Sequence, residues 1–193
     1  MNIAIIKYNA GNIHSVRLAL NRLGINPVVT DDPDVIRRAD RIIFPGVGEA
    51  NSAMRYMRSR GIDLVLKSLS QPVLGICLGL QLMCTTSEEN DTTCLGLFEQ
   101  EVKKFPPGEK VPHMGWNLLE NLSGPLFKEL PSSPYVYFVH SYYAELGLET
   151  CAESEYIIRF SSALYRDNFM AVQFHPEKSG KIGEKILDNF LSL

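Results

Sequence analysis

Two spacings of apolar residues alternate through the first half of the chain. Short apolar runs of strand length are separated by segments whose apolar residues recur at i, i+3, i+4 and i+7, as between Val16 and Leu23, where Gly24 marks the helix end. This alternation predicts a parallel sheet with helices on both faces. The predicted strands are residues 2–7, 27–30, 41–44 and 71–76, and the predicted helices are residues 14–23, 32–39, 50–60, 62–70 and 78–83.

The second half carries mostly strand-like runs with turns between them. These runs cover residues 100–105, 116–119, 135–143, 156–160 and 170–174, and a final helix is predicted at 182–191. We therefore expect an α/β fold with three layers, in which helices flank a mostly parallel central sheet and the second half adds a smaller antiparallel sheet. No linker or repeat divides the sequence, so one domain is expected over residues 1–193.

Composition narrows the classes of function. The 193 residues include 19 Lys and Arg against 22 Asp and Glu, and the net charge of −3 argues against nucleic-acid binding through bulk charge. No apolar run approaches the roughly 20 residues that span a bilayer. The first residues lack a basic segment and a cleavage site, so we expect a cytoplasmic location and no association with a membrane.

The cysteines do not suggest a metal site or a disulfide framework. The four cysteines form no C-x-x-C pair and no Cys/His cluster with zinc spacing. A functional cysteine in this chain is therefore expected to act alone.

Cys77 is the strongest candidate for such a role. The segment Gly75-Ile76-Cys77-Leu78-Gly79 joins a predicted strand to a predicted helix and has the form of a nucleophile elbow, with cysteine in place of serine. A thiolate at a helix N-terminus is favoured by the helix dipole, and the N–H of Leu78 would point to a developing oxyanion. The alternative is a small buried cysteine beside glycines that allow close packing.

A cysteine nucleophile needs a base, and His175 is the best placed of the four histidines. His175 and Glu177 follow the predicted strand 170–174, and in an extended segment residues i and i+2 point the same way. Glu177 could then orient the imidazole as the third member of a triad. His140 competes as the base but has no acid at i+2. The alternative is a histidine at a strand end beside a solvated glutamate.

A glycine-bearing loop offers a second oxyanion donor. Pro45-Gly46-Val47-Gly48 follows a predicted strand and could present backbone N–H groups at its carboxyl end. An ordinary tight turn explains the same residues. A phosphate-binding loop is disfavoured because neither common glycine-rich phosphate motif is present.

Taken together, these motifs resemble a known family. GICLGLQ (75–81), PGVG (45–48) and HPE (175–177) resemble the class I, triad-type glutamine amidotransferases. Within that family, NAGN (9–12), PHMGWN (112–117), YFVHSY (137–142) and HPEKSG (175–180) resemble the glutaminase subunits of imidazole glycerol phosphate synthases. The motifs span nearly the whole chain.

The resemblance implies a role for each motif residue, without a metal or a cofactor. Cys77 would attack the side-chain amide of glutamine, His175 would carry the proton and Glu177 would orient the imidazole. The implied oxyanion hole consists of Gly46, Val47, Gly48 and Leu78. The implied glutamine-binding residues are Gln81, Glu89, His140, Ser141 and Tyr142.

The resemblance also implies a partner, a (βα)8-barrel cyclase subunit. That subunit would combine the ammonia with a phosphoribulosyl-formimino intermediate to form imidazole glycerol phosphate and aminoimidazole carboxamide ribotide in histidine biosynthesis. The implied interface residues are Asn12, Met114, Trp116, Tyr137 and Lys178. The alternatives are the same glutaminase chemistry feeding another synthase, a non-catalytic scaffold for the cyclase, and a cysteine peptidase with the same elbow.

Overall fold

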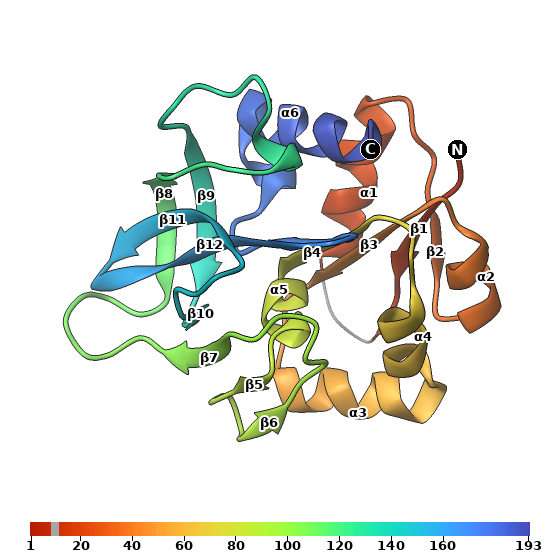
Figure 1. Cartoon of the computed structure of the whole chain (residues 1–193), viewed down its shortest axis with the longest axis horizontal. Helices are drawn as coiled ribbons and strands as arrows, with labels where there is room; N and C mark the ends of the chain where they lie inside the picture. The colour runs from red at the N-terminus through yellow and green to blue at the C-terminus, as the bar shows by residue number, and fades with distance from the viewer. Residues whose placement is uncertain (9–11) are drawn as a thin grey trace.

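A row of parallel strands forms one half of the central sheet (Figure 1). The computed structural model describes residues 1–8 and 12–193, so Asn9, Ala10 and Gly11 of the NAGN motif lie outside the described residues. The parallel strands are, in spatial order, β2 (Val28–Thr30), β1 (Ile3–Ile6), β3 (Arg41–Gly46), β4 (Val73–Cys77) and β13 (Phe169–Val172).

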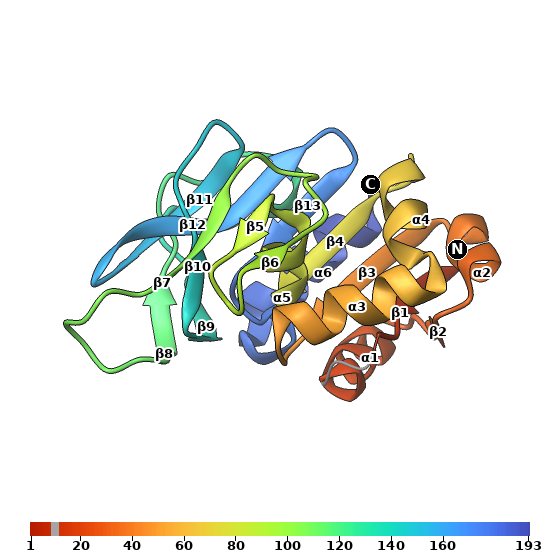
Figure 2. The same cartoon turned by 90° about the horizontal axis from the view of Figure 1, so that it is seen from below.

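The other half of the sheet is largely antiparallel. Beyond β13 the order continues with β12 (Ile158–Arg166), β10 (Tyr142–Ala144), β7 (Glu101–Lys104), β5 (Thr86–Ser87) and β6 (Thr92–Thr93), while β11 (Thr150–Tyr156) pairs with β12. A separate two-stranded antiparallel sheet is formed by β8 (His113–Leu118) and β9 (Tyr135–His140). These strands lie together at the end of the molecule away from β1 and β2 (Figure 2). The added antiparallel sheet predicted for the second half is confirmed.

Helices cover both faces of the parallel strands, which confirms the predicted three layers. In Figure 1, α1 (Ile13–Arg22) and α6 (Gly180–Leu191) lie above the sheet, and α3 (Ala50–Arg60) and α5 (Leu78–Met83) lie below it. The remaining helical segments are α2 (Pro33–Arg38), α4 (Ile62–Ser68) and the 3₁₀ turns η1 (Pro125–Phe127) and η2 (Pro176–Lys178). No helix in the described ranges is long and apolar enough to cross a membrane.

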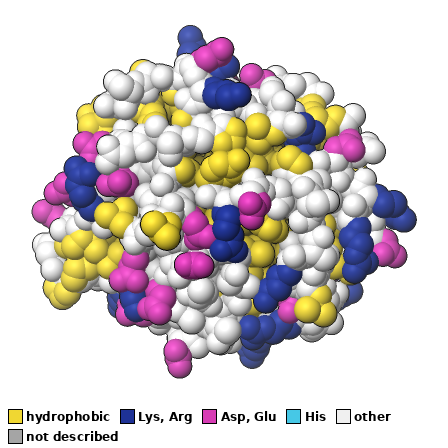
Figure 3. Space-filling view, in the orientation of Figure 1, with side chains coloured by type: hydrophobic (Ala, Val, Ile, Leu, Met, Phe, Trp, Pro, Cys, Tyr) yellow, Lys and Arg dark blue, Asp and Glu magenta, His cyan; other side chains and the backbone are white. Residues whose placement is uncertain are grey.

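Strand alternation divides the core between the two faces. In β1, Ile3 and Ile5 pack with α1 and α6, whereas Ala4 and Ile6 pack with α3 and α4. Both sets are buried, which explains why the parallel strands read as continuous apolar runs rather than as alternating ones. The face seen in Figure 3 is mixed, with acidic and basic side chains side by side and small apolar patches between them.

Several strand boundaries differ from the predictions. The predicted strand 135–143 is divided at Ser141 into β9 and β10, and the region of 156–160 is a hairpin that turns at Ile157, whose φ is 63°. Pro45 and Gly46 remain within β3 because β3 has passed its last pair with β1 and there pairs with β4 alone. The hairpin of β5 and β6 was not predicted, since two-residue strands carry too little periodicity.

Candidate active site

Cys77 occupies a strained turn between β4 and α5. Its φ of 55° and ψ of −106° lie outside the regions that a non-glycine residue normally adopts. Such strain at a strand-to-helix junction is the geometry of a nucleophile elbow. A Cβ on Gly79 would lie 1.9 Å from the carbonyl oxygen of Phe44, and one on Gly75 would lie 3.1 Å from the carbonyl carbon of Gly79. The turn therefore requires both flanking glycines.

His175 and Glu177 form a buried pair. The Nδ1 of His175 lies 2.8 Å from Oε1 of Glu177, and their side chains are 1% and 0% exposed. A carboxylate at this distance requires a proton on Nδ1, so Nε2 is the nitrogen available for proton exchange. Among the described residues, Nε2 of His175 has no hydrogen-bond partner.

The conformation that joins this pair differs from the predicted one. Residues 176–178 form the 3₁₀ turn η2 rather than an extended segment. The backbone N–H of His175 donates to the carbonyl of Tyr137 (2.8 Å), and the hydroxyl of Ser179 donates to the carbonyl of His175 (2.7 Å). The pair is therefore positioned by a local turn that is tied to β9.

The charge of His175 is set by its neighbours. Burial lowers the pKa of His175, but its interactions with Cys77 and Glu177 raise the pKa to about 10 overall. The imidazolium form is therefore favoured at neutral pH. A protonated His175 beside a cysteine is suited to protonate a leaving group.

A cavity of about 270 Å³ opens in front of Cys77. This volume is at the small end of ligand pockets and suits a ligand of amino-acid size. It is lined by Val47, Gly48, Cys77, Leu78, Gln81, Glu89, Pro112, Val139, His140, Ser141 and Tyr142. The structure thus gathers the sequence-predicted glutamine-binding residues, together with three of the four predicted oxyanion residues, around one space.

Gln81 and Glu89 present acceptors to this cavity. The Nε2 of Gln81 donates to the carbonyl of Tyr142 (3.0 Å) and to Oε1 of Gln173 (3.1 Å), which leaves the Oε1 of Gln81 for a ligand. One oxygen of Glu89 accepts from the backbone N–H of Ala50 (2.8 Å), and burial raises the pKa of this carboxyl. Both groups suit the ammonium of an amino acid.

Gly46 is the predicted oxyanion residue that does not line the cavity. It is the last residue of β3 and pairs with Cys77 in the β3–β4 register. A Cβ at Gly46 would lie 1.8 Å from the hydroxyl of Tyr8, so only glycine fits there. Val47 and Gly48, with a φ of 142° at Gly48, continue from this point along the cavity wall.

His140 is held as a neutral side chain. Its Nδ1 lies 2.7 Å from the carbonyl of Tyr142, and its Nε2 lies 3.1 Å from Nδ1 of His113. Burial lowers the pKa of His140 to about 3 and that of His113 to about 4. Both ring nitrogens of His140 are engaged, so His175 is the better candidate for the base.

The sequence analysis missed two groups at the site. Gln173 lies with its Nε2 3.7 Å from the Sγ of Cys77, and the carbonyl of Val139 lies 3.7 Å from the same sulfur. The position of Gln173 two residues before His175 was the one available indication. No cluster of three or more His, Cys, Asp or Glu within residues 1–8 and 12–193 is arranged to hold a metal ion.

Four of the five predicted interface residues lie on or beside the small sheet. Met114 and Trp116 of β8 are 64% and 56% exposed. The rings of Trp116 and Tyr137 meet edge to face at 5.9 Å, and the Nζ of Lys178 lies 5.9 Å from the centre of the Tyr137 ring. Asn12 differs, because its amide donates to Oε1 of Glu177 and thus contacts the His175–Glu177 pair.

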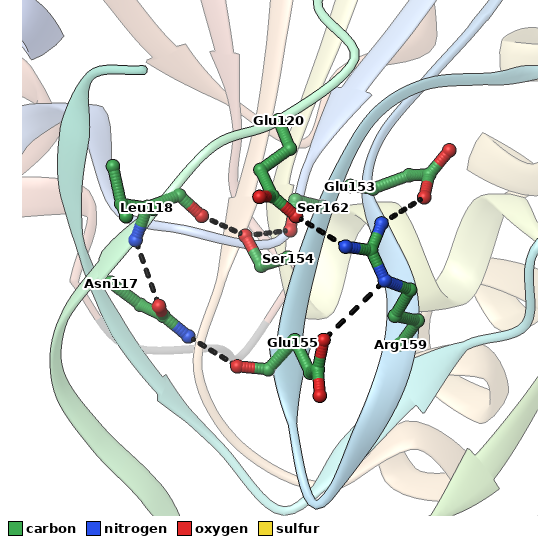
Figure 4. Close-up of polar contacts among 8 residues, drawn as sticks. All are labelled: Asn117, Leu118, Glu120, Glu153, Ser154, Glu155, Arg159 and Ser162. Atoms are coloured by element: carbon green, nitrogen blue, oxygen red, sulfur yellow. Dashed lines mark hydrogen bonds and ion pairs between the residues drawn. The ribbon is translucent and has the colours of Figure 1, made fainter.

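Polar contacts hold β8 against β11 and β12 (Figure 4). The side chain of Asn117 donates to the carbonyl of Glu155 (3.0 Å), and the hydroxyl of Ser154 bridges the carbonyl of Leu118 and the hydroxyl of Ser162. Arg159 forms ion pairs with three carboxylates nearby, those of Glu120, Glu153 and Glu155. These contacts fix the position of β8, the strand that carries the exposed side chains of Met114 and Trp116.

Comparisons with known proteins agree with this geometry. The family model for Glutamine amidotransferase class-I matches residues 5–193. The imidazole glycerol phosphate synthase subunit HisH of Bacteroides fragilis is 56% identical to this chain, and that of Bacteroides thetaiotaomicron is 52% identical, each with full coverage of both chains. A crystal structure titled glutamine amidotransferase superposes with a TM-score of 0.76 at 20% identity, covering 98% of this chain and 97% of the other, which supports the fold alone.

The match to the family model extends over almost the entire chain, and the relatives are similar over their full length. The elbow at Cys77 and the His175–Glu177 pair lie inside the matched region. The chain belongs to the class I glutamine amidotransferases.

Proposed function

We propose that this chain is the glutaminase subunit of an imidazole glycerol phosphate synthase, acting as a single domain over residues 1–193. One observation carries the chemical part of the proposal. The strained Cys77 at the end of β4 lines a cavity of amino-acid size, and the buried His175–Glu177 pair follows the adjacent strand β13, where Cys77 interacts with His175. The synthase part is supported by the names of the full-length relatives.

The reaction begins with attack of the Cys77 sulfur on the side-chain amide carbon of glutamine. The carbonyl oxygen gains negative charge and is stabilised by the N–H of Leu78 and by a backbone N–H of the Gly46–Gly48 segment. His175 protonates the amide nitrogen, the C–N bond breaks, and ammonia leaves. Water then attacks the thioester, with His175 taking its proton, and glutamate and the free thiol are released.

The head group of glutamine is held by polar groups that line the cavity. Gln81 and Glu89 offer oxygen atoms to the substrate ammonium, and the segment from His140 to Tyr142 lines the same cavity. Only an amino acid with a side-chain amide of suitable length then reaches Cys77. This selection supports a glutaminase rather than a peptidase with the same elbow.

The partner is a (βα)8-barrel cyclase subunit that uses the released ammonia. Met114 and Trp116 are exposed, and the Trp116 ring meets the half-buried ring of Tyr137, with Lys178 beside it. Methionine and aromatic residues are enriched at protein interfaces. The side-chain amide of Asn12 donates to Glu177. The released ammonia would pass from Cys77 to the partner on the side where the partner covers β8 and β9.

The decisive experiment is Cys77→Ala in the assembled synthase. We expect glutamine-dependent synthesis to fall by at least about 10³-fold, while ammonia-dependent synthesis continues at the partner's own site. Cys151→Ala, which removes a buried cysteine of β11, is the matched control and should retain glutamine-dependent synthesis. Persistence of glutamine-dependent turnover in Cys77→Ala would exclude Cys77 as the nucleophile.

A further inference from the structure

Gln173 places a buried amide directly against the nucleophile. Its side chain is 0% exposed and lies just after β13, between the sulfur of Cys77 and Gln81. The backbone N–H of Gln173 donates to the carbonyl of Ser162 (2.8 Å), which fixes the residue relative to β12. A buried polar group at a reacting sulfur needs a physical explanation.

The orientation of the amide follows from one backbone group. The carbonyl of Tyr142 is an acceptor only, so the Gln81 atom that contacts it must be the nitrogen Nε2. The same nitrogen contacts Gln173 at 3.1 Å, so the Gln173 atom that faces it must be the oxygen Oε1. The Nε2 of Gln173 is then the atom directed at the Sγ of Cys77, at 3.7 Å.

The same carbonyl is also contacted by a histidine. The Nδ1 of His140 lies 2.7 Å from the Tyr142 oxygen and must therefore carry a proton. His113 in turn lies 3.1 Å from Nε2 of His140. The Tyr142 carbonyl that orients both glutamines is thus held from a second direction.

The sulfur of Cys77 has an acceptor and a donor as neighbours. The carbonyl of Val139, at 3.7 Å, can accept a hydrogen bond from the thiol and so favours the neutral S–H form. An N–H donor at the same distance acts in the opposite direction, because it stabilises a negatively charged sulfur. Gln173 therefore counteracts the effect of the Val139 carbonyl.

We propose that Gln173 is a further catalytic residue, whose Nε2–H donates a hydrogen bond to the Cys77 sulfur and stabilises the thiolate that attacks glutamine. The inference rests on the proposed role of Cys77 as the nucleophile. The donor stays in place through both halves of the reaction. It therefore also stabilises the negative charge that returns to the sulfur when water hydrolyses the thioester.

Alkylation by iodoacetamide measures this effect without any partner. Thiolates are the reactive form of cysteine. Cys77 lines the cavity described above, whereas burial raises the pKa of Cys94 and Cys151 to about 12 and that of Cys84 well above its usual range. Near neutral pH the alkylation rate of the folded chain therefore reports on Cys77.

The test compares Gln173→Met and Gln173→Glu with Gln100→Leu, which removes a buried glutamine that lines a different cavity. We expect Gln173→Met to alkylate about three- to tenfold more slowly at pH 7.5, with a pH–rate profile displaced upward by about 0.5–1 unit. Gln173→Glu should be slower still because it places a carboxylate beside the sulfur. Gln100→Leu should alkylate at the unchanged rate.

The outcomes separate this inference from the proposed function. A folded Gln173→Met variant with an unchanged alkylation profile overturns the role of Gln173. If that variant does not fold, Gln173→Glu, which retains the acceptor toward Gln81, decides by the same measurement. Cys77→Ala tests the nucleophile itself, so loss of glutaminase turnover in Cys77→Ala with normal alkylation in Gln173→Met would refute the Gln173 inference alone.

Discussion

The substitution Glu177→Gln removes the carboxylate charge beside His175 and keeps the shape of the side chain. The two groups are in hydrogen-bond contact at 2.8 Å, and both side chains are almost completely buried. The neutral amide can still accept a hydrogen bond from Nδ1 of His175. The substitution therefore tests the charge interaction rather than the packing.

The magnitude follows from the pKa of His175. Burial lowers this pKa, but Cys77 and Glu177 raise it to about 10, against about 6.5 in an unfolded chain. Loss of one opposite charge typically lowers such a pKa by about 1–3 units, and each unit corresponds to about 1.4 kcal/mol. We therefore expect Glu177→Gln to lower the free energy of unfolding at pH 7 by about 1.5–4 kcal/mol.

The sign of the pH dependence is fixed by the direction of the shift. Because the folded pKa of His175 lies above the unfolded one, its stabilising contribution is complete below about pH 6.5 and is lost as the pH rises through about 10. The difference in stability between the unchanged chain and Glu177→Gln should therefore be largest near neutral pH and should shrink toward high pH.

Urea unfolding between pH 6.5 and 10.5 measures this difference. Glu184→Gln is the control, because Glu184 forms an exposed ion pair with Arg22 (3.3 Å) and such pairs contribute at most about 1 kcal/mol. A difference that stays constant over the whole pH range for Glu177→Gln would refute the reasoning. It would show that the carboxylate acts through packing or hydrogen bonding and not through its charge on His175.

Three further predictions concern the interface, the histidine pair and the elbow. Trp116→Ala should weaken binding of the proposed cyclase partner by at least about tenfold in a titration and change the free energy of unfolding by less than about 0.5 kcal/mol. Leu148→Ala, at a fully exposed position elsewhere, should change neither quantity. The folded pKa of His113 is lowered to about 4, so this histidine destabilises the fold as the pH falls from about 6.5 to 4. His113→Phe should therefore reduce the fall in the free energy of unfolding over this range by about 2–3 kcal/mol. An unchanged fall would contradict this. Gly79→Ala should cost at least about 3 kcal/mol in thermal or urea unfolding, since its Cβ would lie 1.9 Å from a carbonyl oxygen, whereas Gly108→Ala should be tolerated.

The elements that the sequence predicted well are those specified by local pattern. The parallel strands and their helices follow from apolar runs and helical spacing, and the elbow follows from two glycines around Cys77. The hairpin that turns at Ile157 was predicted as one short strand, because no glycine or asparagine at the turn indicates a residue with positive φ. Positive φ at a β-branched residue is imposed by the surrounding sheet and not by local preference.

The active site was predictable only in part, because much of it consists of contacts between distant segments. His175 and Glu177 are close in sequence, so their pairing could be expected, although the turn that joins them was misread as extended. Gln173 contacts Cys77 across 96 positions, and Asn12 contacts Glu177 across 165. A glutamine in an apolar strand end or an asparagine before a helix has ordinary structural uses, so neither residue type carries a local indication of such a contact.

Strand β9 connects the exposed face to the catalytic centre through its backbone. The side chain of Tyr137 belongs to the exposed face, while its carbonyl accepts from the N–H of His175 and the carbonyl of Val139 lies against the sulfur of Cys77. A partner that covered Trp116 and Tyr137 would therefore contact the same strand whose carbonyls face His175 and Cys77. Movement of the Val139 carbonyl away from the sulfur would remove the neighbour that favours the thiol and leave the donor of Gln173 in place.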